Sequence, residues 1–293
     1  LTAYPELASA PGPYAIERHW GVFAPTMDPT SNKLYAFLDS FIAEMAGIFP
    51  DEYFHIGGDE VNGKQWNASP RIRAFKAEKN LPDNAALQAY FNQRLRQILE
   101  RHHKKMIGWD ETLHPDLPKS VVIQSWRGHS YLAKSARQGY AGVLSFGYYL
   151  DHMRPASFHY ENDPAGKEAG ELADSEKSLI LGGEACMWTE FANPDNIESR
   201  IWPRTAAIAE RLWSPREVSD VPDMYRRLVF VSGELELLGV MHRGNQSRML
   251  QRMTGPENVP MLKALADLLT PTGLSVRARA RKYSSLVPLN RMV

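Results

Sequence analysis

The sequence predicts an α/β fold built around a parallel sheet, and three observations support this prediction. Short runs rich in β-branched and aromatic residues recur along the chain. Segments with the apolar spacing of helices alternate with these runs, which favours parallel strands joined by right-handed crossovers. Most of the runs end in Trp, Tyr, Asp or Glu, and the carboxyl ends of parallel strands form the edge where ligands bind. The expected strands are residues 53–56, 106–109, 121–126, 143–151 and 179–184.

Helices are expected between and before these strands. The first begins after Asp28, an N-cap followed by a proline, and ends before Pro50. Residues 151–177 are rich in Asp, Glu, Gly and Pro, and we expect them to form a long solvated insertion on the ligand-facing side. The other expected helices are residues 83–103, 129–138 and 198–212.

Composition indicates an ordinary globular protein with one large α/β domain, because the chain has 293 residues, of which 43% are hydrophobic and 23% charged. No apolar run approaches the length of a membrane span. The 34 basic and 34 acidic residues balance, so nothing favours a nucleic-acid partner. The nine histidines form no metal-ligand pattern, and we expect neither a metal nor a cofactor. The single Cys186 is expected to be a packed thiol rather than a nucleophile.

The most informative motif is the run of residues 53–60, where an apolar strand expected to be buried leads into Gly57, Gly58, Asp59 and Glu60. The glycines allow a sharp turn or a close approach to a ligand. Two adjacent carboxylates are costly to ionise together, so one pKa is expected to rise, as suits a general acid. Taken alone, the motif also allows a simpler interpretation, in which the two acids cap the next helix.

Three blocks of sequence together resemble the β-N-acetylhexosaminidases, family 20 of the glycoside hydrolases. The blocks are residues 55–60, 182–190 and 200–214, and the resemblance covers roughly residues 1–240. It implies a (β/α)8 TIM barrel with the active site at the carboxyl ends of its strands.

On such a barrel the five expected strands would be about strands four to eight, and the first three would lie upstream of Leu1. The chain is therefore expected to be an excerpt of a larger enzyme, and a five-stranded part of a barrel would leave two open sheet edges. Residues 1–245 are expected to form the C-terminal part of the catalytic barrel. Residues 246–293 are expected to form a helical C-terminal extension that packs on the barrel or leads to a further region.

The acid pair also bears on mechanism. Ordinary retaining glycosidases place two carboxyl groups on either side of a sugar, about 5 Å apart, and neighbouring residues on one loop are poorly placed for this. The resemblance implies substrate-assisted catalysis, in which the 2-acetamido oxygen attacks the anomeric carbon and an oxazolinium intermediate forms. Glu60 would protonate the leaving oxygen and then activate water, while Asp59 would orient the acetamido N–H. The implied activity is retaining exo-hydrolysis of terminal β-linked N-acetylglucosamine or N-acetylgalactosamine, as in chitin degradation.

The remaining site residues are also assigned by the resemblance. Trp109, Trp126 and Trp188 would form an apolar box around the acetamido methyl group. Tyr149 would hydrogen-bond the acetamido carbonyl, although the neighbouring Tyr148 is a competing candidate.

Two further acids, Asp151 and Glu190, would bind the outer hydroxyls of the sugar. The pair Asp110 and Glu111 lacks preceding glycines, and we assign it a structural role.

Two other classes stay open at this point. One is a glycosidase that uses two protein carboxylates, for example Glu60 with Glu184 or Glu190. The other is a non-catalytic carbohydrate-binding or structural fragment of a hexosaminidase. The implied partner is an oligosaccharide or glycoconjugate with a terminal N-acetylhexosamine. The sequence does not fix oligomeric state or compartment, although the resemblance suggests secretion, the periplasm or the lysosome.

Overall fold

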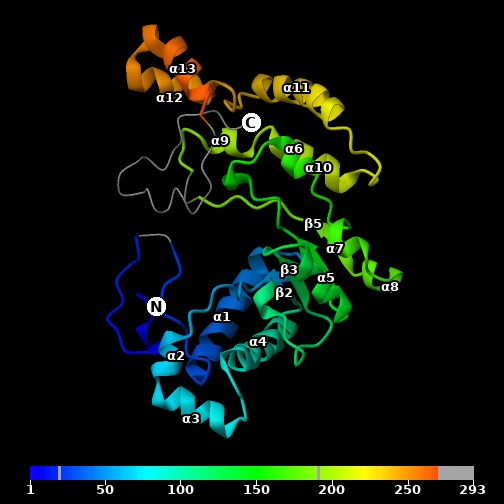
Figure 1. The fold of residues 1–293 in the computed structure, drawn as a ribbon. Coiled ribbons are helices and arrows are strands. Elements are labelled where there is room, and N and C mark those ends of the chain that lie inside the picture. Colours follow the sequence, from blue (N-terminus) through cyan, green and yellow to red (C-terminus); the bar gives the residue numbers. More distant parts are fainter. Residues whose placement is uncertain (19–20, 190–191, 270–293) are drawn as a thin grey trace. The chain divides into compact units, whose positions relative to one another are not determined.

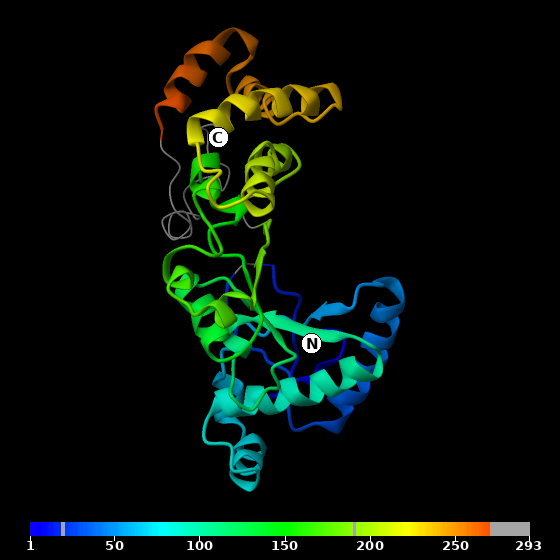
Figure 2. The same ribbon diagram turned by 90° about the vertical axis from the view of Figure 1, so that its right-hand side faces the viewer.

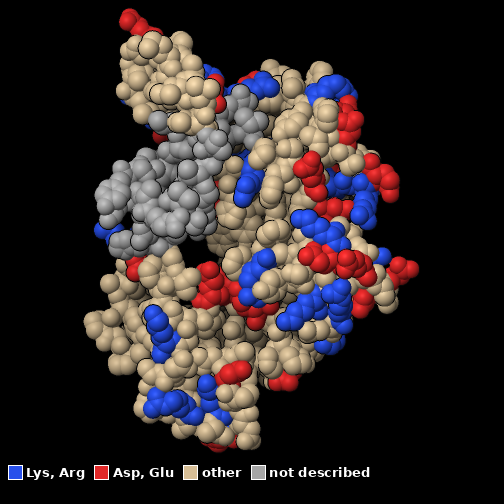
Figure 3. Space-filling view, viewed as in Figure 1, with Lys and Arg blue, Asp and Glu red and all other residues tan. Residues whose placement is uncertain are grey.

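The computed structural model describes residues 1–18, 21–189 and 192–269, which form two compact units. Unit 1 comprises Leu1–Val143 and Glu171–Leu181, and unit 2 comprises the described parts of Leu144–Gly170 and Gly182–Val293. In the described ranges, no helix combines the length and apolarity needed to cross a membrane. On the face shown in Figure 3, Lys and Arg side chains are interspersed with Asp and Glu.

A five-stranded sheet confirms the predicted α/β class, and its strands neighbour one another in chain order (Figure 1). β1 pairs in parallel with β2, and β2 with β3, with Phe54 opposite Met106 and Ile107 opposite Val122. β1 and β5 are therefore the two edges of the described sheet. The strands are β1 (Tyr53–His55), β2 (Lys105–Trp109), β3 (Val122–Ser125), β4 (Gly142–Leu144) and β5 (Ile180–Gly183).

Two details of the strand prediction were wrong. β1 is not buried, because it is an edge strand in which Tyr53 remains 38% exposed. The expected strand at residues 143–151 ends at Leu144. The chain then turns, with Tyr148 N donating to Ser145 O at 3.0 Å and Gly147 at φ +85°. Only Tyr149 returns to strand-like pairing, in an isolated parallel bridge to Cys186.

The core of unit 1 lies between its sheet and two long helices, both predicted from apolar spacing. Figure 2 shows α4 lying along β2. Leu34, Leu99 and Ile123, from α1, α4 and β3, are completely buried in this core. The helices of unit 1 are η1 (Pro5–Leu7), α1 (Asn32–Ile48), α2 (Lys64–Ala68), α3 (Pro70–Glu78), α4 (Asn84–Arg101), η2 (Asp110–Thr112), α5 (His129–Arg137) and α8 (Asp174–Lys177).

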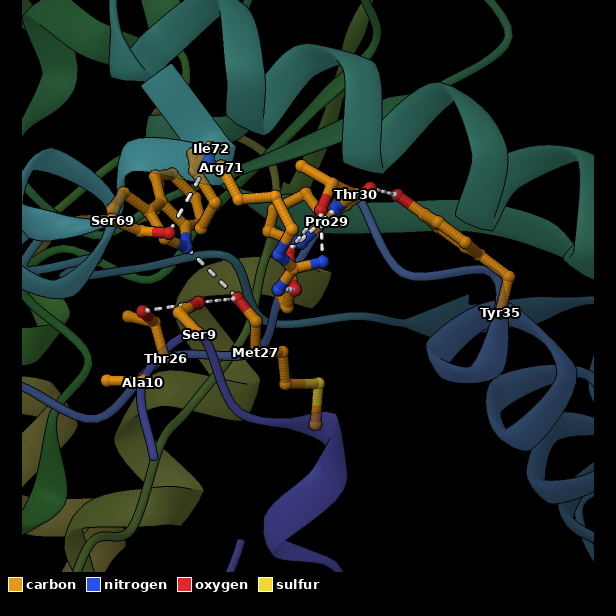
Figure 4. A network of polar contacts seen from close by, with 12 residues as sticks. Ser9, Ala10, Thr26, Met27, Pro29, Thr30, Tyr35, Ser69, Arg71 and Ile72 are labelled. Carbon is orange, nitrogen blue, oxygen red and sulfur yellow. Dashed lines mark hydrogen bonds and ion pairs between the residues drawn. The ribbon is translucent and has the colours of Figure 1, made fainter. Parts of the chain in front are cut away.

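Helix α1 begins four residues after the N-cap predicted at Asp28, because Asp28 caps a turn instead. Its buried carboxylate accepts from Thr30 N at 2.9 Å and from Thr30 Oγ1 at 2.7 Å, and it forms an ion pair with Arg71. Tyr35 of α1 donates to Pro29 O at 2.7 Å. These contacts, shown in Figure 4, tie the N-terminal segment to α1 and α3.

Unit 2 is helical, and its core lies where α6 packs on α10 and α11. Residues 151–177 are not a solvated insertion. They fold into η3, α6, α7 and α8, and the completely buried Tyr160 donates to Glu210 Oε1 at 2.6 Å. The helices of unit 2 are η3 (Leu150–His152), α6 (Ala156–Tyr160), α7 (Lys167–Gly170), α9 (Ile197–Ile201), α10 (Arg204–Trp213), α11 (Val221–Leu237), α12 (Gly244–Thr254), η4 (Pro256–Asn258) and α13 (Val259–Asp267).

The division into residues 1–245 and 246–293 stays a prediction. Its boundary falls inside α12, which begins at Gly244. Residues 270–293 lie outside the described part of the chain.

Candidate active site

The turn after β1 places the two predicted catalytic acids, Asp59 and Glu60, side by side in the chain, and both are exposed. Gly57 and Gly58 have φ values of +72° and +93°, which glycine adopts without steric cost. Glu60 has φ +50°, a conformation that costs a residue with a side chain about 1 kcal/mol or more. Such outliers cluster at functional sites, and this one lies at the residue predicted to be the general acid.

The simpler interpretation of the motif required the acids to cap the following helix, and they do not. Helix α2 begins at Lys64, with Gly63 as its N-cap residue. Lys64 N donates to Asn62 Oδ1 at 3.2 Å, so Asn62 serves the helix start. The carboxylates of Asp59 and Glu60 therefore do not serve as the N-cap of α2.

Three hydrogen bonds fix the backbone of the turn. Gly57 N donates to His55 Nδ1 at 3.0 Å, and Trp109 N donates to Gly57 O at 3.0 Å. Gln88 Nε2, from α4, donates to Gly58 O at 2.6 Å. The acid pair therefore follows a backbone that is held from β1, β2 and α4.

His55 lies close to the acids in the chain, but it was not among the site residues predicted from the sequence. Its ring meets the ring of Trp109 edge to face, with centroids 4.9 Å apart. Although part of the imidazole reaches solvent, desolvation by its surroundings lowers its pKa, against the opposing effects of the Asp59 charge and a hydrogen bond with Gln124. A neutral imidazole is favoured here. His55 opens the block of residues 55–60 that carries the resemblance, but neither its spacing nor its residue type indicated a role beyond the strand.

Two predicted walls of the acetamido box lie in unit 1: Trp109 is the last residue of β2, and Trp126 follows β3. Trp109 is only 8% exposed. The indole N–H of Trp126 donates to both carboxylate oxygens of Glu111, at 2.9 and 3.2 Å. Burial raises the pKa of Glu111, and the hydrogen bond from Trp126 acts in the opposite direction. Glu111 therefore fixes the orientation of the Trp126 ring.

Asp110 fixes the backbone of the same segment. Its buried carboxylate accepts from Trp126 N at 3.0 Å and from Arg127 N at 3.2 Å, and it forms an ion pair with the Arg127 guanidinium. Asp110 and Glu111 thus have the structural role expected from the sequence.

In unit 2, two residues predicted for separate roles, Tyr149 and Trp188, lie within hydrogen-bonding distance of each other. The phenol oxygen of Tyr149 hydrogen-bonds with the side chains of Ser145 and Trp188, and burial raises its pKa. The ring stacks on His152, with centroids 4.9 Å apart. Tyr148, the competing candidate, is completely buried and donates to Asn162 O. Tyr149 is thus the better candidate of the two.

Asp151 is almost completely buried, at 4% exposure, and His152 Nε2 lies 3.9 Å from its carboxylate. The buried Arg204, at the start of α10, donates to Leu150 O at 2.6 Å and to Arg154 O at 2.8 Å. Arg204 therefore holds the segment that bears Tyr149 and Asp151. Burial lowers the pKa of Arg204 to about 10, and the charge of Asp151 opposes this shift.

Cys186 is a packed thiol, as expected. It is buried, and burial raises its pKa to about 12, which keeps the thiol protonated at neutral pH. Glu190, the last predicted sugar-binding residue, lies outside the described residues.

Comparison with known proteins identifies the family. The model of the glycosyl hydrolase family 20 catalytic domain matches residues 1–216. A chitobiase structure from Flavobacterium johnsoniae is 42% identical, with a TM-score of 0.91 over 98% of this chain and 45% of that chain. An exo-β-N-acetylglucosaminidase from Vibrio harveyi, solved in complex with N-acetylglucosamine, is 31% identical with a TM-score of 0.67, over 73% of this chain and 36% of that chain.

The subunit beta of mouse (Mus musculus) beta-hexosaminidase is 35% identical over 216 residues, which are 71% of this chain and 40% of that protein. The chain thus spans less than half the length of these relatives. Because the family model covers most of the chain and includes the turn with both acids, the chain belongs to family 20 of the glycosyl hydrolases.

Proposed function

We propose that this protein is a retaining exo-glycosidase that releases terminal β-linked N-acetylglucosamine or N-acetylgalactosamine from oligosaccharides or glycoconjugates. The observation that carries the proposal is the turn after β1, which presents two consecutive, exposed carboxylates, Asp59 and Glu60, on a backbone held at three points. The names of the relatives, which include a chitobiase and an exo-β-N-acetylglucosaminidase, support the same substrate class.

The adjacency of the acids favours a nucleophile that comes from the substrate. Two carboxyl groups on either side of an anomeric carbon stand about 5 Å apart in ordinary retaining enzymes, with the sugar between them. Consecutive residues of one turn are poorly placed to hold a sugar ring between their carboxylates. In the proposed first step, the 2-acetamido carbonyl oxygen attacks the anomeric carbon, and the leaving oxygen takes the proton of Glu60.

The second step reverses the proton transfer. The Glu60 carboxylate removes a proton from water, and the resulting hydroxide attacks the anomeric carbon and reopens the oxazolinium ring. Asp59 orients the acetamido N–H and stabilises the positive charge that develops on it. The lowered pKa of His55 favours its neutral form, which carries no positive charge that would compete with that interaction.

The other residues in the proposal bind and orient the sugar. Glu111 orients Trp126, and a hydrogen bond joins Tyr149 to Trp188. These contacts support a substrate-binding role for the three residues, because side chains that are already held in place can orient a sugar for reaction. The proposed acetamido box consists of Trp109, Trp126 and Trp188, Tyr149 binds the acetamido carbonyl, and Asp151 and Glu190 bind the outer hydroxyls.

The proposal also extends to the barrel. We propose that β1 to β5 are strands four to eight of a (β/α)8 barrel, that residues 1–245 belong to it and that residues 246–293 form a helical extension. The chain-order sheet, its two edges and the 45% coverage of the Flavobacterium johnsoniae chitobiase support this arrangement.

A comparison of two aryl glycosides tests the proposal. The protein, expressed from its complete gene, should hydrolyse an aryl N-acetyl-β-glucosaminide at least about 10³-fold faster than the matching β-glucoside, since only the former supplies an intramolecular nucleophile. Comparable rates on both would contradict substrate assistance and favour Glu60 acting with a second protein carboxylate. Binding without turnover of either compound would favour a non-catalytic carbohydrate-binding role.

A further inference from the structure

A glutamine from a distant helix holds the peptide that leads into the acid pair. Gln88 Nε2 donates to Gly58 O at 2.6 Å, a contact between residues 30 positions apart. The accepting carbonyl belongs to the peptide bond that joins Gly58 to Asp59. The orientation of this peptide plane sets the direction in which the chain leaves the turn toward both carboxylates.

The helix behind Gln88 is a rigid support. Leu87 and Leu99 of α4 are completely buried. The helix start is capped by Asp83, whose carboxylate accepts from Ala86 N at 2.8 Å. Leu87 also packs with Trp66 in a separate cluster beside α2 and α3. Gln88 thus projects from a helix that is anchored on both sides of it.

The turn itself leaves little room for adjustment beside Gly58. A Cβ atom at Gly58 would lie 2.5 Å from Thr112 Cγ2, so the backbone already touches the Thr112 side chain. Gly58 and Glu60 both have positive φ values, +93° and +50°. A residue such as Glu60 keeps this conformation only where its surroundings over-determine it.

We propose that Gln88 is a positioning residue for catalysis, which holds the Gly58–Asp59 peptide so that the carboxylates of Asp59 and Glu60 keep their reactive orientation. This inference rests on the proposed function of the two acids. Its physical basis is geometric, because a displacement of about 1 Å in a reacting group can cost about 10²-fold in rate. Gln88 has no direct part in bond making.

The same helix offers a matched control. Gln93 Nε2 donates to Asp116 O at 2.9 Å, so it also joins α4 to a backbone carbonyl, but in a loop remote in sequence from the acid turn. Methionine has the length of glutamine and a high helix propensity, but its side chain donates no hydrogen bond. Gln88→Met and Gln93→Met therefore each remove one amide hydrogen bond to a backbone carbonyl, a partly buried one at Gln88 and an exposed one at Gln93.

The experiment measures kcat, KM and thermal melting for both variants, with an aryl N-acetyl-β-glucosaminide as substrate and the protein expressed from its complete gene. Gln88→Met should lower kcat about tenfold or more with KM within twofold of wild type. Gln93→Met should keep both constants within twofold. Gln88→Leu serves as a second variant if Gln88→Met is not obtained folded, with the same expected result.

Equal values of kcat for Gln88→Met and Gln93→Met would overturn the inference, and so would a kcat loss fully accounted for by unfolded protein. The wild-type protein separates this outcome from failure of the proposed function. If wild type does not prefer the N-acetyl substrate, the proposed function is wrong whatever the variants do. If wild type shows the preference and Gln88→Met matches the control, only the role of Gln88 is wrong.

Discussion

The turn after β1 and the segment after β4 hold their functional candidates in opposite ways. In the turn, Asp59 and Glu60 are exposed, and the contacts that fix them act on the backbone before them. In the segment after β4, Tyr149 is partly buried and Asp151 is almost completely buried, and Asp151 lies near the buried charge of Arg204. A group that exchanges protons with substrate and water must lie within hydrogen-bond reach of both, whereas a group that orients a substrate gains from rigidity.

The two supports also differ in cost. Neutral hydrogen bonds from Gln88 and Trp109 hold the acid turn, and each contributes about 1 kcal/mol to stability. Arg204 instead places a guanidinium in the interior of unit 2, where it donates to the carbonyls of Leu150 and Arg154. Removing the hydrogen-bond partners of a buried charge destabilises a protein strongly, because the charge is then left without compensation. We therefore expect changes in the turn to affect rate most, and changes around Arg204 to affect stability most.

The largest expected effect is that of Glu60→Gln. The amide cannot transfer a proton, so hydrolysis of a substrate with a poor leaving group, such as a disaccharide, should fall by about 10² to 10⁴. An aryl glycoside with an activated leaving group should lose much less, because its departure needs little protonation. Parallel assays of the two substrates measure the difference. An equal loss on both would show that Glu60 does not act as the general acid.

Arg204→Met should produce the largest change in stability. The variant leaves Asp151 with less compensating positive charge and removes the donors to the backbone carbonyls of Leu150, Arg154 and Arg200, which should cost about 3 kcal/mol. Arg226→Met is a suitable control, since the Arg226 side chain is 64% exposed and its ion pair with Asp223 should contribute less than about 1 kcal/mol. Denaturant unfolding of both variants makes the comparison. Similar losses of unfolding free energy in the two variants would show that Arg204 does not hold the segment that bears Tyr149 and Asp151.

An effect of similar size appears only at acid pH and involves His159, which contacts the chain just after β4. His159 is completely buried, its Nδ1 lies 2.6 Å from Gly147 O, and burial lowers its pKa to about 4. The unfolded chain therefore binds a proton at higher pH than the folded chain does. The stabilisation is complete above about pH 6.5 and is lost as pH falls toward 4, by roughly 3 kcal/mol in total.

His159→Gln should reduce this acid sensitivity, because glutamine does not titrate. Unfolding free energies measured between pH 7 and 4 give the slope for each protein. The variant should lose less stability over this interval than wild type. Identical slopes would show that His159 is not protonated on unfolding in this range.

The sequence predicted the parts of the molecule that depend on local patterns. Apolar spacing identified α1 and α4, and the two glycines identified the turn before Asp59 and Glu60. The strand predicted at residues 143–151 was wrong because the chain turns at Gly147. A Cβ at Gly147 would lie 2.5 Å from Asn162 Nδ2, and this close approach cannot be read from the linear sequence.

The supporting residues of the candidate site were harder to predict. Gln88 acts through one contact with a backbone carbonyl 30 positions away, and Arg204 acts through contacts with backbone carbonyls 50 and 54 positions away. Neither residue type is unusual in a helix, and no periodicity marks such a contact. Trp126 could be selected as an aromatic strand end, but its orientation by Glu111 required the folded geometry.

The most direct test of substrate-assisted catalysis is the effect of Asp59→Asn on the hydrolysis of an activated aryl N-acetyl-β-glucosaminide. If the acetamido group of the substrate is the nucleophile and Asp59 orients it, participation is needed whichever leaving group departs. We therefore expect kcat to fall by about 10² or more, by similar factors for the activated substrate and a disaccharide. Wild-type turnover of the activated substrate by Asp59→Asn would contradict the orienting role and, with it, the proposed mechanism.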